Sequence, residues 1–187
     1  MPTLDELEIV QPNPAIHPIA AFDCGHADLN DFIKNDWSRQ ADQRLAYTKL
    51  ALYQNNLVAY ITLLSDSIVL HESERKWFIE REIRVHHVAA LKIARLGTDN
   101  QFKRQGIGTA LMKYAVGVAF RMNEMGVGCR FLTLDSDMGA TSFYEKLGFV
   151  YSQHRDYKKK DYPNMHYDLI TQPPIRTLPQ FALSYSN

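Results

Sequence analysis

Apolar residues recur at helical spacing in several stretches of the chain. From Asp28 onward the spacing places them on one face of a helix, which we expect Asp28 to cap and which should end near Asp42. A longer helix is predicted from Thr109 to Asn123, and the charged stretch from Glu72 to Arg84 favours a surface helix. The apolar faces comprise Leu29, Phe32, Ile33, Trp37 and Ala41 in the first helix, and Ala110, Leu111, Tyr114, Ala115, Val118 and Met122 in the longer one.

Shorter runs that are rich in aromatic and aliphatic residues predict strands. Gln54-Asn55-Asn56 separates two of these runs, and because these residues tolerate positive φ, an antiparallel hairpin is expected there. The first 22 residues, which contain Pro2, Pro12, Pro14 and Pro18, predict an irregular lead-in with room for one short strand. The predicted strands comprise residues 47–53, 57–64, 91–98, 130–134, 149–153 and 164–170.

The order of these elements indicates the fold class. A strand, a glycine loop and a helix follow one another over residues 91–123, and a second strand and helix then repeat the order, ending at Gly148. The second helix carries the apolar stripe Ala140, Phe143, Tyr144 and Leu147. We therefore expect an α/β protein of the α+β type, with one domain spanning residues 1–187, a core at about residues 20–170 and a C-terminal tail at 171–187.

Composition and charge narrow the possible partners. Lys plus Arg and Asp plus Glu both number 21, so no global positive field attracts nucleic acid or an anionic membrane, and any polyanion site must be local. No apolar stretch approaches the roughly 20 residues of a membrane span. Cys24 and Cys129 lie far apart without metal-ligand spacing, which indicates reduced thiols and no metal site. We expect a cytoplasmic protein that does not associate with membranes.

The segment Lys103-Arg104-Gln105-Gly106-Ile107-Gly108-Thr109 stands between a predicted strand and a predicted helix. Glycines there allow the backbone to approach a ligand closely, and the first N–H groups of the helix can hold a pyrophosphate. The alternative is a tight turn without a ligand. The segment lacks both the Lys-Ser/Thr ending of a P-loop and the three-glycine dinucleotide fingerprint.

The sequence around this loop resembles the GNAT superfamily of N-acetyltransferases. Ile93-Ala94-Arg95-Leu96-Gly97-Thr98 is similar to the central cofactor strand of that family, and Lys103 to Thr109 to its Gln/Arg-x-x-Gly-x-Gly/Ala loop. The segment from Ala140 to Phe149 resembles its A-x-x-F-Y-x-x-x-G-F element. The resemblance covers roughly residues 20 to 170. It implies a mixed, mainly antiparallel sheet flanked by helices, with a V-shaped cofactor cleft.

The same resemblance implies an enzyme that moves an acetyl group directly from acetyl-CoA to a primary amine. Backbone N–H groups near Leu96, Gly97 and Thr98 would bind pantetheine and polarise the thioester carbonyl, and Tyr144 would protonate the departing thiolate. The alternative for Tyr144 is a core aromatic residue on a helix stripe. The implied cofactor contacts are completed by Lys103, Arg104, Gln105, Gly106, Ile107, Gly108, Thr109 and Tyr144.

A base that removes the proton of the amine is harder to identify. The candidates are His86, His87, Asp135 and His166, each of which is more often structural than catalytic, and an ordered water chain is an alternative. Arg95 lies in an otherwise apolar strand, so it must find an anion or project from the sheet.

Phe22-Asp23-Cys24-Gly25, followed by Leu29-Asn30 and Phe32, resembles a subgroup that includes the GNAT toxins acting on aminoacyl-tRNA. This likeness leaves three functions open: acetylation of a small-molecule or peptide amine, a toxin with a small DNA-binding antitoxin as partner, or a non-catalytic acetyl-CoA sensor. In the toxin reading the run Lys158-Lys159-Lys160 would contact RNA phosphates, and otherwise it is a solvated loop. A homodimer is compatible with the sequence.

Two residues depart from the general family pattern. Lys103 stands where Gln or Arg is usual, which we expect to be tolerated because backbone amides make most pyrophosphate contacts. Asp137 stands where an Asn often begins the second helix, and its expected effect is a weaker cofactor contact or a helix cap.

Overall fold

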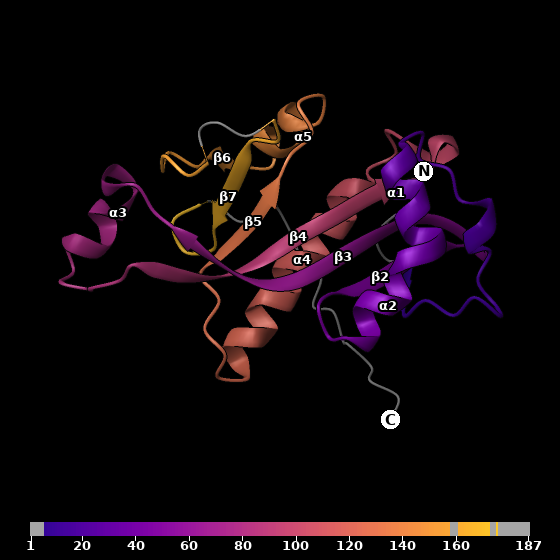
Figure 1. The fold of residues 1–187 in the computed structure, drawn as a ribbon, viewed down its shortest axis with the longest axis horizontal. Coiled ribbons are helices and arrows are strands. Elements are labelled where there is room, and N and C mark those ends of the chain that lie inside the picture. The colour runs from indigo at the N-terminus through magenta and orange to yellow at the C-terminus, as the bar shows by residue number, and fades with distance from the viewer. Residues whose placement is uncertain (1–5, 158–160, 173–174, 176–187) are drawn as a thin grey trace.

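A single sheet of seven strands organises the protein (Figure 1). The computed structural model describes residues 6–157, 161–172 and 175. The spatial order is β1-β2-β3-β4-β5-β7-β6, and the β4–β5 pair is parallel whereas the other neighbouring strands run antiparallel. The expected mixed, mainly antiparallel sheet is therefore confirmed. The strands are β1 Glu8–Val10, β2 Tyr47–Tyr53, β3 Asn56–Val69, β4 His87–Thr98, β5 Phe131–Asp135, β6 Val150–Tyr151 and β7 Asn164–Asp168.

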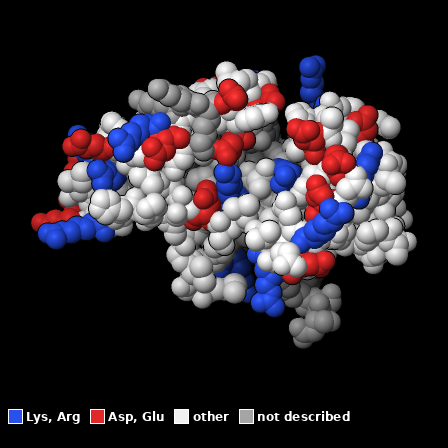
Figure 2. Space-filling view, viewed as in Figure 1, with Lys and Arg blue, Asp and Glu red and all other residues white. Residues whose placement is uncertain are grey.

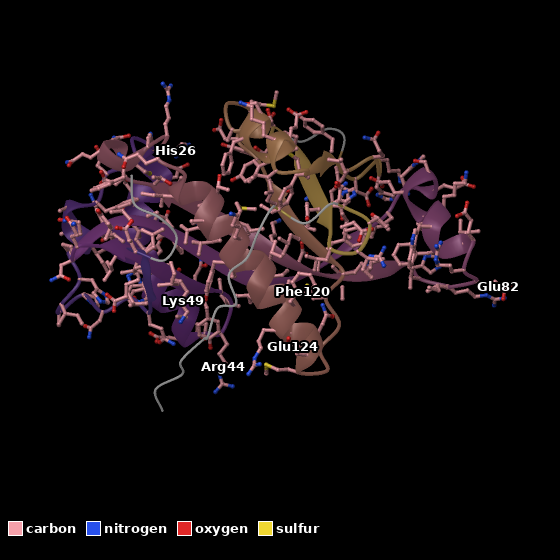
Figure 3. All side chains as sticks on the ribbon, turned by 180° about the vertical axis from the view of Figure 1, so that it is seen from behind. His26, Arg44, Lys49, Glu82, Phe120 and Glu124 are labelled. Atoms are coloured by element: carbon pink, nitrogen blue, oxygen red, sulfur yellow. The ribbon has the colours of Figure 1, made fainter. Side chains whose placement is uncertain are left out.

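Helices cover both faces of this sheet. Seen from behind, the longest helix lies across the strands, with Phe120 and Glu124 toward one of its ends (Figure 3). Among the described residues, no helix has the length and apolar character needed to cross a membrane. The helices are α1 Ala27–Asp31, a π-helix Phe32–Asp36, α2 Trp37–Asp42, α3 Glu72–Ile79, α4 Ile107–Glu124 and α5 Thr141–Lys146, with 3₁₀ turns at Ile19–Ala21 and Asn100–Phe102.

Alternate residues of β2 and β3 supply two separate cores. Ala51, Ala59 and Ile61 are fully buried on the face that packs against α4. Leu50 and Tyr60 point to the opposite face, where they pack against the segment that leads into α2. This alternation follows from the two-residue period of a strand, and it explains why both strands contain nearly continuous apolar runs.

The hairpin between β2 and β3 forms as the sequence predicts. Gln54 and Asn55 have φ values of 49° and 62°, and Tyr53 pairs directly with Asn56. Two central residues with positive φ are typical of a type I′ turn, whose twist matches that of the flanking strands. β3 nevertheless runs to Val69, beyond the predicted end at Leu64, because Ser65, Asp66 and Ser67 interrupt the apolar pattern while they still pair with β4.

The predicted helix over residues 28–42 needs a correction. It begins at Ala27, and Asp28 does not cap it because His26 occupies the N-cap position. A π-helical turn interrupts its middle, which places the consecutive residues Phe32 and Ile33 in the core together. A sequence pattern with a period of 3.6 residues does not reveal such a turn. The predicted strand 149–153 also shortens to Val150–Tyr151.

Candidate active site

The site is built where two parallel strands separate. β4 and β5 pair at Ala90–Phe131, Leu91–Leu132 and Lys92–Thr133 only, although β4 continues to Thr98 and β5 to Asp135. Beyond Lys92 on β4 and Thr133 on β5, the facing edges of the two strands no longer pair with each other. The two strands therefore form the sides of a V-shaped opening, as expected.

A β-bulge in β4 accompanies this separation. On β3, Thr62 faces Arg95 and the next residue, Leu63, faces Ile93, so Ala94 has no counterpart. A bulge adds local twist and bends its strand. The bend lies two residues after the last β4–β5 pair, where it helps to direct the end of β4 away from β5.

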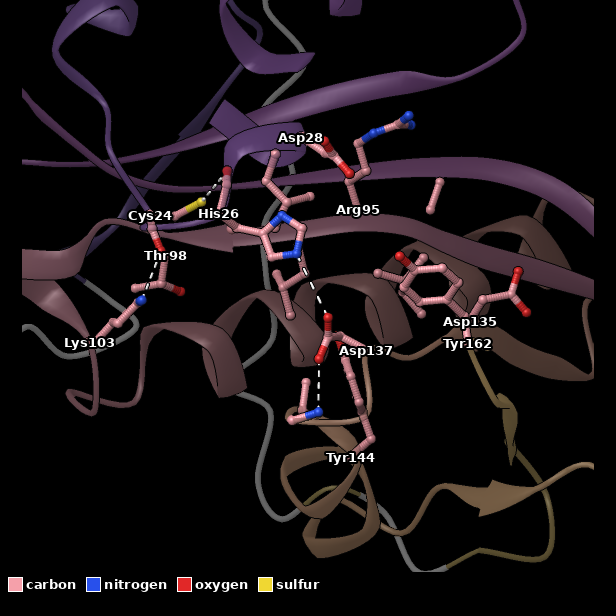
Figure 4. A pocket seen from close by; sticks show the side chains of 17 residues that line it. Cys24, His26, Asp28, Arg95, Thr98, Lys103, Asp135, Asp137, Tyr144 and Tyr162 are labelled. Atoms are coloured by element: carbon pink, nitrogen blue, oxygen red, sulfur yellow. Dashed lines mark hydrogen bonds and ion pairs between the residues drawn. The ribbon is translucent and has the colours of Figure 1, made fainter. Parts of the chain in front are cut away.

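Two connected chambers occupy the opening. The loop chamber, about 610 Å³, is lined by the end of β4, the loop before α4 and Phe143 of α5. The His26 chamber, about 690 Å³, is lined by residues 93–98 of β4, by the segment before and into α1, and by the ends of β5 and α5 (Figure 4). Both chambers are lined by Leu96, Thr98, Lys103, Gly139, Ala140 and Tyr144.

The glycine loop leads directly into α4. Gly106 is the N-cap residue and has a φ of 82°, a left-handed conformation that favours glycine. A Cβ atom added to Gly108 would lie 3.3 Å from Cζ of Phe143, so the second glycine allows α4 to approach α5 closely. Together they expose the first N–H groups of an 18-residue helix to the loop chamber.

The other loop residues contribute differently. The Lys103 ammonium donates to the Cys24 carbonyl oxygen at 2.7 Å, which ties the loop to the segment before α1. Arg104, Ile107 and Thr109 line the loop chamber, and the side chain of Ile107 also packs in the core. Gln105 lines neither chamber, and its amide donates to the Gln101 carbonyl oxygen at 3.2 Å.

Leu96, Gly97 and Thr98 lie on the part of β4 that has separated from β5. Gly97 has no room for a side chain, because an added Cβ would lie 2.7 Å from the Tyr60 ring. At Gly97 the strand therefore offers its backbone alone.

Tyr144 lines both chambers from α5. Its ring packs edge-on against Phe143 and Phe149, and only 9% of the residue is exposed. Burial raises the pKa of its hydroxyl to about 12. Tyr144 therefore keeps its proton at neutral pH, and its hydroxyl can donate a hydrogen bond.

Comparison with known proteins identifies the family. The sequence profile of the acetyltransferase (GNAT) family matches residues 10–149. The chain belongs to the GNAT family. No curated protein sequence matches this chain closely enough to count as a relative.

Several solved structures share the GNAT fold of this chain. A tyrosine-to-phenylalanine mutant of KacT has a TM-score of 0.74 at 22% identity, covering 88% of this chain and 95% of KacT. AtaT complexed with acetyl-methionyl-tRNA has a TM-score of 0.73 at 21% identity, covering 87% of this chain and 94% of AtaT. AtaTR bound with acetyl-CoA has a TM-score of 0.67 at 22% identity, covering 88% and 94%. At such identities the likeness shows the fold.

The predicted base candidates are not gathered in the GNAT cleft. His86 and His87 are exposed and line neither chamber. His166 is buried on β7, where burial lowers its pKa and the Ser152 hydroxyl lies 3.1 Å from Nδ1. Asp135 does line the His26 chamber, but the Lys92 ammonium donates to its carboxylate at 2.6 Å.

Sequence reasoning missed the pair formed by His26 and Asp137. The imidazole Nε2 lies 3.7 Å from the Asp137 carboxylate, across the cleft of the GNAT fold (Figure 4). Asp137 is not a helix cap, since α5 begins after Ala140 and the Asp137 carboxylate accepts the Gly139 N–H at 2.8 Å. The two residues stand far apart in the chain, so no local pattern links them.

The surroundings of Arg95 show how the protein accommodates a charged side chain in an otherwise apolar strand. Its guanidinium lies 3.8 Å from the centroid of the Phe32 ring, on the side of the sheet that α1 covers. Stacking on an aromatic face stabilises a guanidinium. The run from Lys158 to Lys160, the other feature assigned to an anionic ligand, lies outside the described residues.

Proposed function

We propose that this chain transfers an acetyl group from acetyl-CoA to a primary amine. The observation that carries the proposal is the separation of β4 and β5 after Lys92 and Thr133, because it brings the glycine loop and Tyr144 to one continuous cleft. Membership of the acetyltransferase (GNAT) family supports the same reaction. The bound acetyl-CoA supplies a reactive thioester.

The residues present fit acetyl-CoA. The loop chamber offers the N–H groups at the start of α4 to a pyrophosphate, and a side chain at position 108 would meet Phe143. The edge of β4 at Leu96, Gly97 and Thr98 offers backbone groups to the amides of pantetheine and to the acyl oxygen. We assign Lys103 a positioning role, since its ammonium holds the loop against the Cys24 segment.

Tyr144 is the group that we assign to the leaving sulfur. It lines both chambers, so the residue lies where the two halves of the cleft meet. A phenol whose pKa is raised to about 12 by burial remains protonated near neutral pH. Because a phenol of this pKa is a weaker acid than a thiol, it gives its proton to the sulfur only as it takes another from the acceptor nitrogen while the carbon–sulfur bond breaks.

We propose a second, narrower function, in which the acceptor is the amino group of an aminoacyl-tRNA. Its support is the likeness to AtaT complexed with acetyl-methionyl-tRNA, over 87% of this chain. The KacT and AtaT structures also include complexes with antitoxin and with DNA, so a small DNA-binding antitoxin is the corresponding partner. Acetyl-CoA and aminoacyl-tRNA both occur in the cytoplasm, where we place the protein.

Surface charge gives this narrower function little support. Lys and Arg lie among Asp and Glu on the face shown in Figure 2, without a broad positive patch. The formal net charge of the chain at pH 7 is zero. A protein that contacts several phosphates gains affinity from a basic surface.

Thiol release from acetyl-CoA, measured with polyamines, amino acids, peptides and aminoacyl-tRNA, tests the reaction. We expect release with at least one amine, and acetyl-CoA binding by calorimetry in its absence. Binding without release for every acceptor would contradict the enzyme and favour an acetyl-CoA sensor.

The narrower function has its own test in cells. Induced expression should stop growth, and isotope-labelled acetyl groups should appear on the amino acid of charged tRNA. The Tyr144→Phe variant, expressed to the same level, is the control and should permit growth. Normal growth with the active wild-type protein and no label in charged tRNA would exclude this acceptor.

A further inference from the structure

An amine acceptor needs a base. Alkyl amines carry a proton at neutral pH, and the ammonium must lose it before nitrogen can attack. The titratable groups that share the His26 chamber come from every element around it. They are Cys24 and His26 before α1, Asp28 on α1, Arg95 on β4, Lys103 before α4, Asp135 at the end of β5, Asp137 after it, Tyr144 on α5 and Tyr162 before β7.

Most of these groups are unsuited to accept a proton. Arg95 is a stacked guanidinium, which stays charged, and the Lys103 ammonium already donates to the Cys24 carbonyl. Tyr144 holds its own proton. Burial raises the pKa of the Cys24 thiol, whose Sγ lies 3.2 Å from the Asn30 carboxamide oxygen.

The carboxylates are weaker bases than an imidazole. Asp135 is also occupied, because the Lys92 ammonium donates to one oxygen at 2.6 Å and the Asn164 amide to the other at 2.9 Å. Asp28 is exposed on α1. His26 supplies the imidazole among the residues that line this chamber, and an imidazole is the side chain that most often serves as a general base.

His26 is placed to act on an acceptor. Its side chain is 45% exposed, so a ligand can reach it, and it extends into the chamber from the N-cap of α1 (Figure 4). Asp137 faces its Nε2 at 3.7 Å, and the Gly139 N–H at 2.8 Å fixes the orientation of that carboxylate. A carboxylate beside one ring nitrogen favours the tautomer with the proton there, which leaves the other nitrogen free to accept.

We propose that His26 is the general base that deprotonates the acceptor amine, and that Asp137 positions it. The assignment rests on the proposed acetyl transfer. One ammonium proton passes to His26 and later to solvent, and the nitrogen lone pair forms the bond to the acyl carbon. As the carbon–sulfur bond breaks, Tyr144 protonates sulfur, and the second proton lost by nitrogen restores the Tyr144 hydroxyl. The imidazolium is stabilised meanwhile by Asp137.

The test compares His26→Gln with wild type over pH 6 to 10, using phenethylamine and methionyl-tRNA as acceptors. We expect kcat/KM to fall by about 10²-fold at neutral pH, the lower bound for loss of a general base. The defect should shrink as the pH approaches the range where the amine deprotonates unaided. Acetyl-CoA affinity by calorimetry and the circular dichroism spectrum should be unchanged. His86→Gln, at an exposed histidine outside both chambers, is the matched control and should behave as wild type.

Asp137→Asn separates positioning from a merely structural effect. Without the carboxylate the imidazole loses the acceptor that orients it, so kcat should fall, though less than in His26→Gln, while the KM for the acceptor stays unchanged. A His26→Gln defect that is equal at all pH values, or no defect, would overturn the assignment. If neither acceptor releases thiol, the comparison uses whichever amine of the wider panel does, and a wild-type protein that releases no thiol with any of them would overturn the proposed function, and this base with it.

Discussion

The Lys92 ammonium lies 2.6 Å from a carboxylate oxygen of Asp135, at the base of the V between β4 and β5. Lys92 belongs to the last paired position of the two strands, and Asp135 lies two residues beyond its partner Thr133. The side chains are 25% and 30% exposed, so solvent screens the pair only in part. The ion pair therefore joins the strands where their backbones cease to do so.

Replacing Lys92 with Met should reduce the free energy of unfolding by about 1–3 kcal/mol, the cost of leaving a partly buried charge short of a partner. Acetyl-CoA affinity should also fall, because the ion pair no longer fixes the distance between β4 and β5 at the base of the cleft. Urea unfolding and calorimetry measure the two effects. Lys76→Met removes an exposed pair with Glu80 and should change stability by less than about 0.5 kcal/mol. Equal losses in both variants would contradict a special role for Lys92.

Gly108→Glu should abolish acetyl-CoA binding while the protein remains folded. The new side chain starts 3.3 Å from Phe143 and brings a negative charge to the place assigned to a pyrophosphate. Calorimetry measures the affinity and circular dichroism the fold. Gly117→Glu adds the same charge to the same helix, where a Cβ meets no atom within 4 Å, and should leave affinity intact. Unchanged affinity in folded Gly108→Glu would remove the loop from the site.

Tyr144→Phe should lower kcat by about 10²- to 10⁴-fold, the usual effect of removing a general acid. Phenylalanine keeps the edge-on packing against Phe143 and Phe149, so stability and acetyl-CoA affinity should change little. Steady-state thiol release measures kcat, and calorimetry measures acetyl-CoA affinity. A fall of less than about threefold would mean that Tyr144 serves packing alone.

Arg130→Met should reduce the free energy of unfolding by about 3–5 kcal/mol, because it leaves the largely buried Asp168 carboxylate without its cation. The Arg130 Nε donates to Asp168 Oδ1 at 2.6 Å, and the guanidinium stacks over Trp77. Urea unfolding measures the loss, with Arg121→Met, an exposed partner of Glu124, as the control of near-zero effect.

The same pair gives stability a pH dependence. Burial opposes ionisation of Asp168, but hydrogen bonds from Arg130, the Ile170 N–H and Thr171 outweigh it and hold the pKa of Asp168 below its usual range. A lowered folded pKa gives a stabilisation that is complete above the unfolded value of about 3.9 and is lost as pH falls through the folded value. The Arg130→Met deficit should accordingly shrink at strongly acidic pH. A deficit that is constant down to pH 2 would contradict an electrostatic origin.

Much of the fold followed from the sequence because its signals are local. Helical spacing indicated α4, and the turn residues Gln54 and Asn55 indicated the β2–β3 hairpin. The family resemblance placed Tyr144 and the glycine loop, which the structure brings to one cleft. Their catalytic and binding roles stay predictions.

What the sequence could not show depends on distance or on irregular backbone. The π-turn at Phe32–Asp36 leaves no mark in a pattern of period 3.6, and the bulge at Ala94 depends on register with β3. His26 and Asp137 meet only because β5 and the segment before α1 lie on opposite sides of the same opening. Pairing of this kind is set by the whole sheet.

The separation of β4 and β5 can also be described as a missing strand within a sheet. Past Lys92 and Thr133, each strand presents an inner edge whose N–H and C=O groups have no partner in the other strand. Such edges usually invite another polypeptide, but here they face each other inside a cleft. A thin, extended molecule with amide groups can occupy the gap and complete both edges. By this reasoning the cleft favours an occupant of backbone-like shape, and the contacts that it offers along β4 come from backbone groups.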